Sequence, residues 1–466
     1  MHNDKESPFT LTLADGALTL PVLRFSGREA LNQPYRFEVE ALGLAPALTP
    51  AALLHQPAFL RLRDDHGIHG VIHSVGCEHQ TLHQKAYRLV LVPNLQRLDQ
   101  TARRRVFVNR SVPAIIEQLL VEHHLSADGY RMAMTTGQYP PRPFCIQYEE
   151  TDLALLRRLC EEEGIHFHFE HRRDGHVAVF ADDSLSLPQT PVTVAFNAQA
   201  DAPAPAIGAL FQRHDAVGPP MPQSAPHRGQ DSPADDAANQ TVPSLPVTAD
   251  NRSPEAVHAD QRSRRRLQRQ RCRYRCAQGR SNATELRSGH LLQVADHPIN
   301  TFNEQWLITE LRHQGQQPSI LQPTPMPHRY HNDFTALPWS TEYRPPQKQA
   351  RPQIPGYQPA QVVGLSAGPA QLDDQGRMAV RLWPSQPQGD GTETLWLPIA
   401  SAGAHERIAR EHLPRAGSQV WVNFLDSDPD RPILFLEAGQ RPLPCEPPAP
   451  ADERLLDWLL NRAEPS

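Results

Sequence analysis

The sequence predicts a mainly β protein built from short strands that close into small barrels. In the first hundred residues apolar and polar side chains alternate, and Asp15-Gly16 joins two such runs. Asp-Gly is the strongest short hairpin signal because both turn positions need positive φ. Proline makes up 47 of the 466 residues, about twice its usual share, which disfavours long helices. At roughly 150 residues per domain, the length allows about three domains.

Charge and cysteine usage narrow the class further. With 52 acidic and 46 basic residues the formal net charge is −6, which gives no general drive toward nucleic acid or anionic lipid. The six cysteines lack the dense spacing of a secreted disulfide framework, which fits a reducing cytoplasm. The polar N-terminus predicts no signal peptide, and no run approaches the ~18 apolar residues that span a bilayer. We expect no stable membrane insertion before the protein is expelled from the cell, and export only by a dedicated machine.

The elements of the first half follow from local patterns. Alternation predicts strands at residues 37–40, 59–63, 68–75 and 87–92. Ser111 is suited to cap a helix that carries Ile115, Ile116, Leu119 and Leu120. A second helix starts at Thr151 and ends at Gly164, a residue suited to a left-handed cap. The period then changes to two, and Asp174-Gly175 closes another hairpin. We therefore expect an α/β insertion over residues 101–180.

The second half is less regular. Residues 214–258 are rich in Pro, Ala, Asp and Gln, a composition that predicts a flexible loop. A stretch rich in arginine follows at 262–275, and strands are expected at 290–294 and 306–311. Five prolines at residues 341–360 suit a stiff, extended linker.

A compact β module is expected beyond the linker, over residues 361–441. Its five expected strands lie at 361–365, 377–382, 395–398, 419–425 and 433–436, which suits a small closed barrel of the OB type. Residues 442–466 form a tail in which a short amphipathic helix is expected. Its apolar face comprises Leu455, Leu456, Leu459 and Leu460, with Trp458 beside it. Such a short helix is marginal alone in water, so it predicts either a docking partner or packing on its own barrel.

Three stretches carry a resemblance to a known family. They are YRLVLVPNL at 87–95 with SVPAIIEQLL at 111–120; YPPRPFCIQYEETDL at 139–153 with EEEGIHFHFEH at 161–171; and GSQVWVNFLDSDPDRPI at 417–433. In order and spacing this resembles the VgrG spike proteins of bacterial type VI secretion, which are built like the baseplate hub and spike proteins of contractile-tailed phages.

The resemblance implies a phage-hub-like region of two similar β-barrels over residues 1–340, followed by the OB-type barrel. It implies a homotrimer whose six hub barrels sit on the hexameric Hcp tube. It also implies contacts with baseplate proteins and with a tip protein of the PAAR type, an adaptor or an effector. No catalysis is required of these parts. The basic stretch at 262–275 resembles a helix packed on the hub.

The chain also departs from the family pattern. Family members usually continue past the barrel into a long triple-stranded β-helix, whereas about twenty-five residues follow it in this sequence, so we expect a short form without this needle. The aromatic and acidic run expected after the Gly-Arg strand is replaced by Leu382-Trp383-Pro384-Ser385-Gln386. Trimerisation would then lack the most extensive interface of the family.

The sequence gives only weak signals for metal-binding and catalytic groups. Glu122-His123-His124 and the His166, His168 pair contain possible metal ligands, but alternation predicts that His166 and His168 share a solvent face. Cys272 and Cys276 have no second ligand pair in the sequence, and His405-Glu406 lacks the second histidine of a zinc-protease helix. No nucleophile elbow, phosphate loop or dinucleotide fingerprint occurs. Glu161, Glu162 and Glu163 are expected to solubilise a helix end. We therefore expect no bound metal, no cofactor and no enzymatic activity.

The sequence therefore favours a structural spike or hub subunit of a contractile injection machine, assembled in the cytoplasm and expelled on sheath contraction. The alternatives are a phage tail hub of a related particle, or an OB-fold protein that binds nucleic acid or a ligand through the arginine stretch. The favoured interpretation predicts no nucleic-acid partner. Leu455, Leu456, Trp458, Leu459 and Leu460 are the candidate docking residues for a tip protein, adaptor or effector.

Overall fold

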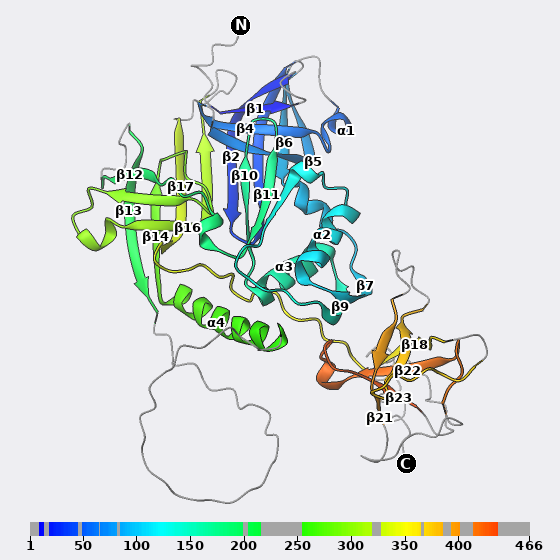
Figure 1. Ribbon diagram of the computed structural model, residues 1–466. Helices are drawn as coiled ribbons and strands as arrows, with labels where there is room; N and C mark the ends of the chain where they lie inside the picture. The colour runs from blue at the N-terminus through cyan, green and yellow to red at the C-terminus, as the bar shows by residue number, and fades with distance from the viewer. Residues whose placement is uncertain are drawn as a thin grey trace, which may run out of the picture. The chain divides into compact units, whose positions relative to one another are not determined.

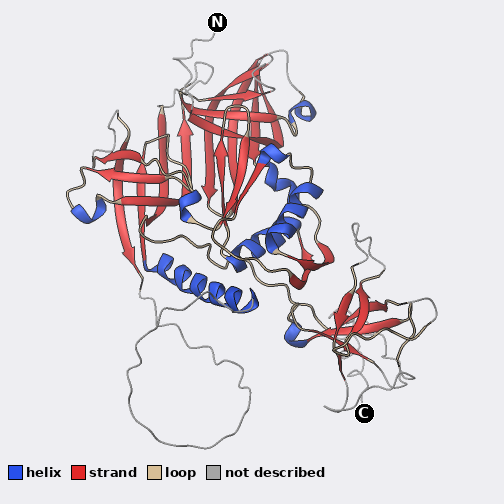
Figure 2. Cartoon of the chain, in the orientation of Figure 1, coloured by secondary structure: helices blue, strands red, loops and turns tan. Residues whose placement is uncertain are grey.

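The computed structural model describes residues 9–13, 18–44, 49–64, 66–81, 84–198, 204–215, 254–318, 328–364, 368–384, 393–400 and 413–436. Strands dominate these residues (Figure 2). The chain divides into two compact units, Met1–Pro352 and Gln353–Ser466. Each unit is described separately below.

The first unit begins with a closed barrel (Figure 1). Its strands are β1 (Thr10–Leu13), β2 (Leu18–Ala30), β3 (Gln33–Leu44), β4 (Pro57–Arg63), β5 (His66–Thr81) and β6 (Gln84–Val92), with helix α1 (Pro50–Leu53) before β4. They pair in the order β1-β4-β5-β6-β3-β2, and β1 pairs again with β2, which closes the ring. Leu13 pairs with Leu18 across the expected hairpin, so that prediction is confirmed for the strands, while residues 14–17 lie outside the described part.

The first unit contains a second closed ring of six strands. It comprises β12 (Val192–Phe196), β13 (Ala206–His214), β14 (Arg275–Ser281), β15 (Leu291–Ala295), β16 (Gln305–Gln316) and β17 (Arg329–Pro338). The order is β16-β15-β12-β13-β14-β17, closed by the pairing of β16 with β17. Its core is built around Trp306, Leu292 and Ile308, which are fully buried or nearly so. Strand β2 pairs with β16, so the two rings share one 12-stranded sheet. The expected double barrel is confirmed.

The insertion between the rings contains helices and short sheets. Its elements are β7 (Arg103–Arg110), α2 (Val112–Glu122), β8 (Tyr130–Ala133), β9 (Arg142–Glu150), α3 (Asp152–Glu163), β10 (His166–His171) and β11 (His176–Ala181). Both helix predictions are confirmed: Ser111 Oγ accepts a hydrogen bond from the Ala114 amide at 3.4 Å, and Thr151 Oγ1 accepts one from Ala154 at 3.2 Å. Gly164 ends α3 with φ of 71°, the left-handed conformation that glycine adopts without strain.

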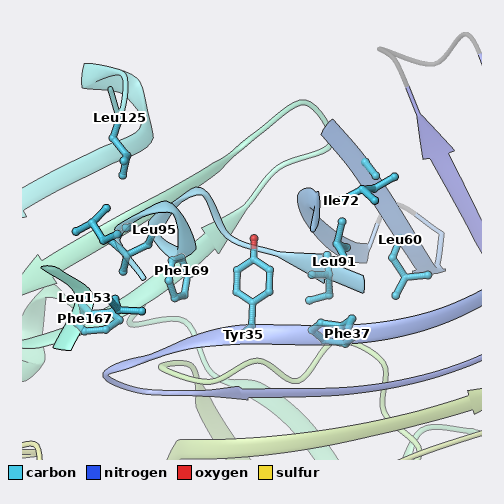
Figure 3. Close-up of a cluster of buried hydrophobic side chains, with 14 of the residues drawn as sticks. Tyr35, Phe37, Leu60, Ile72, Leu91, Leu95, Leu125, Leu153, Phe167 and Phe169 are labelled. Atoms are coloured by element: carbon cyan, nitrogen blue, oxygen red, sulfur yellow. The ribbon is translucent and has the colours of Figure 1, made fainter. Parts of the chain in front are cut away.

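The apolar faces of α2, α3 and β10 join the core of the first ring (Figure 3). Tyr35 and Phe37 of β3 lie in this cluster with Phe167 and Phe169 of β10. Leu156 of α3 is completely buried there, and truncating such a side chain costs about 2–5 kcal/mol. The insertion is therefore part of the hydrophobic core, which fixes where the end of α3 lies.

Helix α4 (Pro254–Tyr274) carries the arginine-rich stretch and contacts β13 and β14, as the resemblance predicts. Residues 216–253 of the expected loop lie outside the described residues, and α4 already begins at Pro254. Among the helices that the structure describes, none combines the length and apolar character needed to cross a membrane.

The second unit is a small closed barrel. Its strands are β18 (Tyr357–Val362), β19 (Met378–Leu382), β20 (Leu395–Leu397), β21 (Ile399–Ala400), β22 (Gln419–Phe424) and β23 (Pro432–Phe435), in the order β20-β19-β18-β22-β23-β21. Only Pro398 separates β20 from β21, and its carbonyl accepts a hydrogen bond from the Leu434 amide at 2.9 Å, which closes the ring. The predicted strands are found within a few residues of their expected places.

Candidate assembly surfaces

The outer face of the shared sheet is strongly charged where the two rings join. Arg24 of β2 pairs with Glu40 of β3 at 2.5 Å. Arg28 of β2 donates two hydrogen bonds to Glu310 of β16, at 2.9 and 3.1 Å. We call this the charged face; it comprises Arg24, Arg28, Arg36, Glu38, Glu40, Arg88, Arg280, Glu310, Arg312 and Asp333. Exposed ion pairs contribute about 0–1 kcal/mol each, so this pattern matters more for recognition than for folding.

The charged face is hollowed over the junction of the rings. A hollow of about 750 Å³ is lined by residues of β2, β3, β5, β6, β16 and β17, among them Arg24, Glu38, Arg88 and His331. Charged and polar side chains line it together with the apolar Phe25, Val39, Leu89 and Val90. Such a surface suits contact with another protein across a wet, reversible interface.

A second feature is a buried cluster at the C-terminal end of α3. Three arginines from distant segments donate to the backbone carbonyls there: Arg265 to Glu163, Arg269 to Glu161 and Glu162, and Arg344 to Gly164. The last carbonyls of a helix lack partners and carry the negative end of its dipole, so guanidinium groups stabilise them. We call these three residues the arginine clamp.

The glutamates at the same helix end are buried, with exposed fractions of 3 % for Glu161, 8 % for Glu162 and 1 % for Glu163. The expectation that they solubilise the helix is wrong. Although burial acts to raise the pKa of Glu163, hydrogen bonds from His258 and Arg142 lower it to about 2. Burial also acts to raise the pKa of Glu162, but Arg142 and nearby arginines outweigh it and lower that pKa. Burial raises the pKa of Glu161.

Glu161 and the arginine clamp together hold the segment that leads toward the second unit. One oxygen of Glu161 accepts hydrogen bonds from the backbone amides of Lys348 and Gln349, both at 2.7 Å. Arg269 donates to the Pro345 carbonyl at 3.0 Å. We call residues 342–351 the strap. The first part of the proline-rich stretch is thus bound along its backbone to α3 and α4.

The histidine prediction is wrong. His166 and His168 on β10 have no exposed surface. The ring centre of Tyr343 in the strap lies 6.1 Å from the ring centre of His166. Gly289 packs against His168 so closely that a β-carbon at position 289 would lie 3.0 Å from the His168 β-carbon. Burial lowers the pKa of His166 to about 3. Alternation alone predicted a solvent face because it does not show that both sides of the small sheet are covered.

The other candidate ligands serve structural contacts. Glu122 pairs with Arg105 at 2.6 Å, and His123 lies 2.7 Å from Asp152. The thiols of Cys272 and Cys276 are free. In the described part of the chain no group of His, Cys, Asp or Glu side chains is arranged to hold a metal ion. The candidate docking residues Leu455, Leu456, Trp458, Leu459 and Leu460 lie outside the described residues.

The second unit presents an apolar patch on the outside of its barrel. Tyr357 of β18 is 54 % exposed and Phe435 of β23 is 37 % exposed, and their rings meet edge to face at 5.6 Å. Trp421 of β22 lies between Pro359 and Phe435 in the strand register. Because these rings adjoin one another on the outside of the barrel, we treat them as a candidate contact surface.

The alternation of residues in the sequence did not predict the charged face. The signal is present in β2 and β3, where Arg24, Ser26 and Arg28 alternate with apolar residues, as do Arg36, Glu38 and Glu40. What pattern cannot supply is the pairing of β2 with β16. Arg28 and Glu310 are 282 residues apart in sequence.

Comparison with known proteins agrees with this architecture. Residues 28–319 match the family described as phage tail baseplate hub (GPD). Among curated proteins, the chain is 36 % identical over 449 residues to the type VI secretion system spike protein VgrG5 of Pseudomonas aeruginosa, and 34 % identical over 476 residues to VgrG4b of the same organism. These alignments cover 92 % and 95 % of this chain, which spans 57 % and 58 % of the length of those relatives.

Among solved structures, the chain is similar to the E. coli c3393 protein, described as a component of the type VI secretion system with structural similarity to the T4 bacteriophage tail proteins gp27 and gp5. The TM-score is 0.67 at 24 % identity, over 91 % of this chain and 98 % of that one. At this identity the likeness concerns the fold.

Proposed function

This chain belongs to the phage tail baseplate hub family, and from that premise we propose that it is a structural hub and spike subunit of a type VI secretion system. The observation that carries the proposal is the pair of closed six-stranded rings joined through β2 and β16. Relatives named as type VI spike proteins, aligned over more than nine-tenths of this chain, support it.

The proposed assembly is a homotrimer in which six hub barrels form a ring on the hexameric Hcp tube. Two similar rings per subunit supply the repeat that three copies need to match a sixfold partner. The charged face offers a polar contact surface on the first unit, and the apolar patch around Tyr357, Trp421 and Phe435 offers one on the second. We propose that the chain works by assembly and force transmission and has no catalytic role.

Its partners follow from the same proposal. Besides Hcp, they are baseplate proteins and a tip protein of the PAAR type, an adaptor or an effector. The tail residues Leu455, Leu456, Trp458, Leu459 and Leu460 are proposed to dock one of these. Deleting residues 451–466 should then remove that partner from pull-downs without changing the number of subunits in the hub. In the cell the protein would assemble in the cytoplasm and leave with the tube.

The direct test is the mass of the purified protein, alone and with its cognate Hcp protein, by native mass spectrometry. A trimer that binds a hexameric ring is expected. A chain that stays monomeric at micromolar concentration and never associates with Hcp would contradict the proposal. A tail-tube protein of a phage particle binding in place of Hcp would instead assign the chain to that related machine, which the family description also fits.

A further inference from the structure

Helix α4 presents two different faces. Its inner face is bound to the first unit: Arg265 is 3 % exposed and donates to the end of α3, Arg269 donates to the strap, and Cys272 donates to the Glu342 carbonyl at 3.2 Å. The helix itself runs along the outside of the first unit (Figure 1). The buried contacts therefore fix which side of the helix points outward.

The outer face has the spacing of a helix-pairing seam. Ser263, Leu267, Gln270 and Tyr274 follow one another at intervals of four, three and four residues, which places them in one row along the helix. Leu267 is 46 % exposed and Tyr274 is 55 % exposed. In a heptad numbered from Leu267 at position a, these residues occupy the a and d positions.

Arginines occupy both flanks of this row. In the same numbering Arg264 and Arg271 stand at position e, and Arg266 and Arg273 at position g. All four are exposed. Within the described residues Arg264, Arg271 and Arg273 form no ion pair with a carboxylate. We call this the arginine-flanked face: Ser263, Leu267, Gln270 and Tyr274 with Arg264, Arg266, Arg271 and Arg273.

Charge at the flanking positions decides the partner. Residues at e and g face those of the partner helix, where opposite charges favour pairing and like charges oppose it. A second copy of α4 would bring arginine against arginine in either orientation, so self-pairing is disfavoured. An acidic helix with apolar residues at a and d satisfies both the row and its flanks.

We propose that the arginine-flanked face of α4 docks an acidic amphipathic helix of another protein. This goes beyond the proposed function, since it assigns a protein-binding surface on the first unit away from the tail. Leu267 and the last residue of the helix, Tyr274, are exposed, although the Tyr274 ring also meets His214 of β13 edge to face at 5.7 Å. They favour a protein over nucleic acid, because Tyr and Arg are enriched at protein interfaces and leucine has no role in phosphate contacts.

The test uses the full chain and two labelled synthetic peptides of about 21 residues, the length of α4. Both carry Leu at a and d, and they differ only in having Glu or Lys at e and g. Fluorescence anisotropy should show binding of the Glu peptide, weakening as salt rises, and no binding of the Lys peptide. Equal binding of both peptides would overturn the proposal.

Charge reversal supplies the second arm. The variant R264E/R266E/R271E/R273E should lose roughly tenfold or more affinity for the Glu peptide and gain binding of the Lys peptide, because each favourable flank becomes repulsive. The matched control R172E/R173E reverses two exposed arginines in the β10–β11 turn and should leave the preference unchanged. Equal losses in the variant and the control would sink the assignment.

Two further measurements keep the result interpretable. Leu267→Ser alters the row without altering charge, and it should weaken binding of the Glu peptide severalfold in a protein whose thermal unfolding is unchanged. Binding of duplex DNA and of anionic vesicles is measured as well. If either binds more tightly than the Glu peptide and loses affinity in the charge-reversed variant, the arginine-flanked face is a polyanion-binding surface and the proposal is wrong. The Hcp and mass experiments use no α4 variant, so failure here is distinct from failure of the proposed function.

Discussion

Replacing Glu163 with glutamine tests whether the buried charges at the end of α3 stabilise the first unit. The carboxylate lies 2.6 Å from Arg142 and 2.8 Å from His258. Its pKa of about 2, against an ordinary 4.5, means that folding favours the ionised form. One pKa unit corresponds to about 1.4 kcal/mol, so we expect Glu163→Gln to lower the free energy of unfolding by about 3 kcal/mol at pH 7.

The pH dependence gives an independent check. Because the folded-state pKa lies below the unfolded one, the contribution of Glu163 is complete above about pH 4.5 and disappears as the pH falls toward 2. The difference in unfolding free energy between the wild-type protein and Glu163→Gln should therefore shrink across that window. A difference that stays constant with pH would show that the loss arises from packing and not from charge.

The measurement must report the first unit alone, because the chain has two units and need not unfold in one step. Urea unfolding followed by hydrogen exchange of peptides from α3 and β10 does this. The matched control is Glu149→Gln, whose side chain is 57 % exposed in a surface pair with Arg104, and it should change stability by less than about 0.5 kcal/mol. Equal losses in the two variants would refute the reasoning.

Three other substitutions give distinct outcomes. Gly27→Ala places a β-carbon about 2.0 Å from the ring of Phe37, so it should cost about 1–3 kcal/mol and lower the Tm, whereas Gly175→Ala meets nothing within 4 Å and should not. His166→Leu removes a ring whose pKa burial lowers to about 3, below the unfolded value of 6.5. The wild-type protein therefore loses stability as the pH falls from about 6.5 toward 3, and the Tm of the variant should rise relative to wild type over that range. Parallel curves of Tm against pH would contradict this mechanism. Phe435→Ser should leave the Tm of the second unit nearly unchanged and reduce self-association in light scattering; an unchanged mass would remove the apolar patch as a contact surface.

Local signals in the sequence predict the elements well because they act over a few residues. The caps of α2 and α3, at Ser111 and Thr151, depend on one side chain and an amide three positions on. The left-handed Gly164 is equally local. Strands with clean alternation are predicted for the same reason, whereas the sequence did not predict β7, β8, β9, β12, β13, β14 or β17.

Long-range partners explain what the sequence did not predict. Glu161 reads as a surface residue at a helix end, yet its hydrogen-bond partners at Lys348 and Gln349 lie 187 and 188 residues away. His166 reads as solvent-facing until the strap, through Tyr343, is placed over it. The spacing of the row on α4 is a local property of the helix, but only the burial of Arg265 determines which face of the helix points outward.

Closure of both rings in the first unit has a consequence for how copies meet. Within the described residues each strand of the two rings has a neighbour on both sides over at least part of its length. Strand β13 pairs with β12 only at Ala206 and Ile207, however, so most of its edge on that side is open. Recognition through the closed parts of these rings must therefore rely on side chains, whose charges are sensitive to salt and single substitutions. Backbone-driven fusion of neighbouring sheets, the usual hazard of large β proteins, is therefore limited to short open stretches such as this edge of β13.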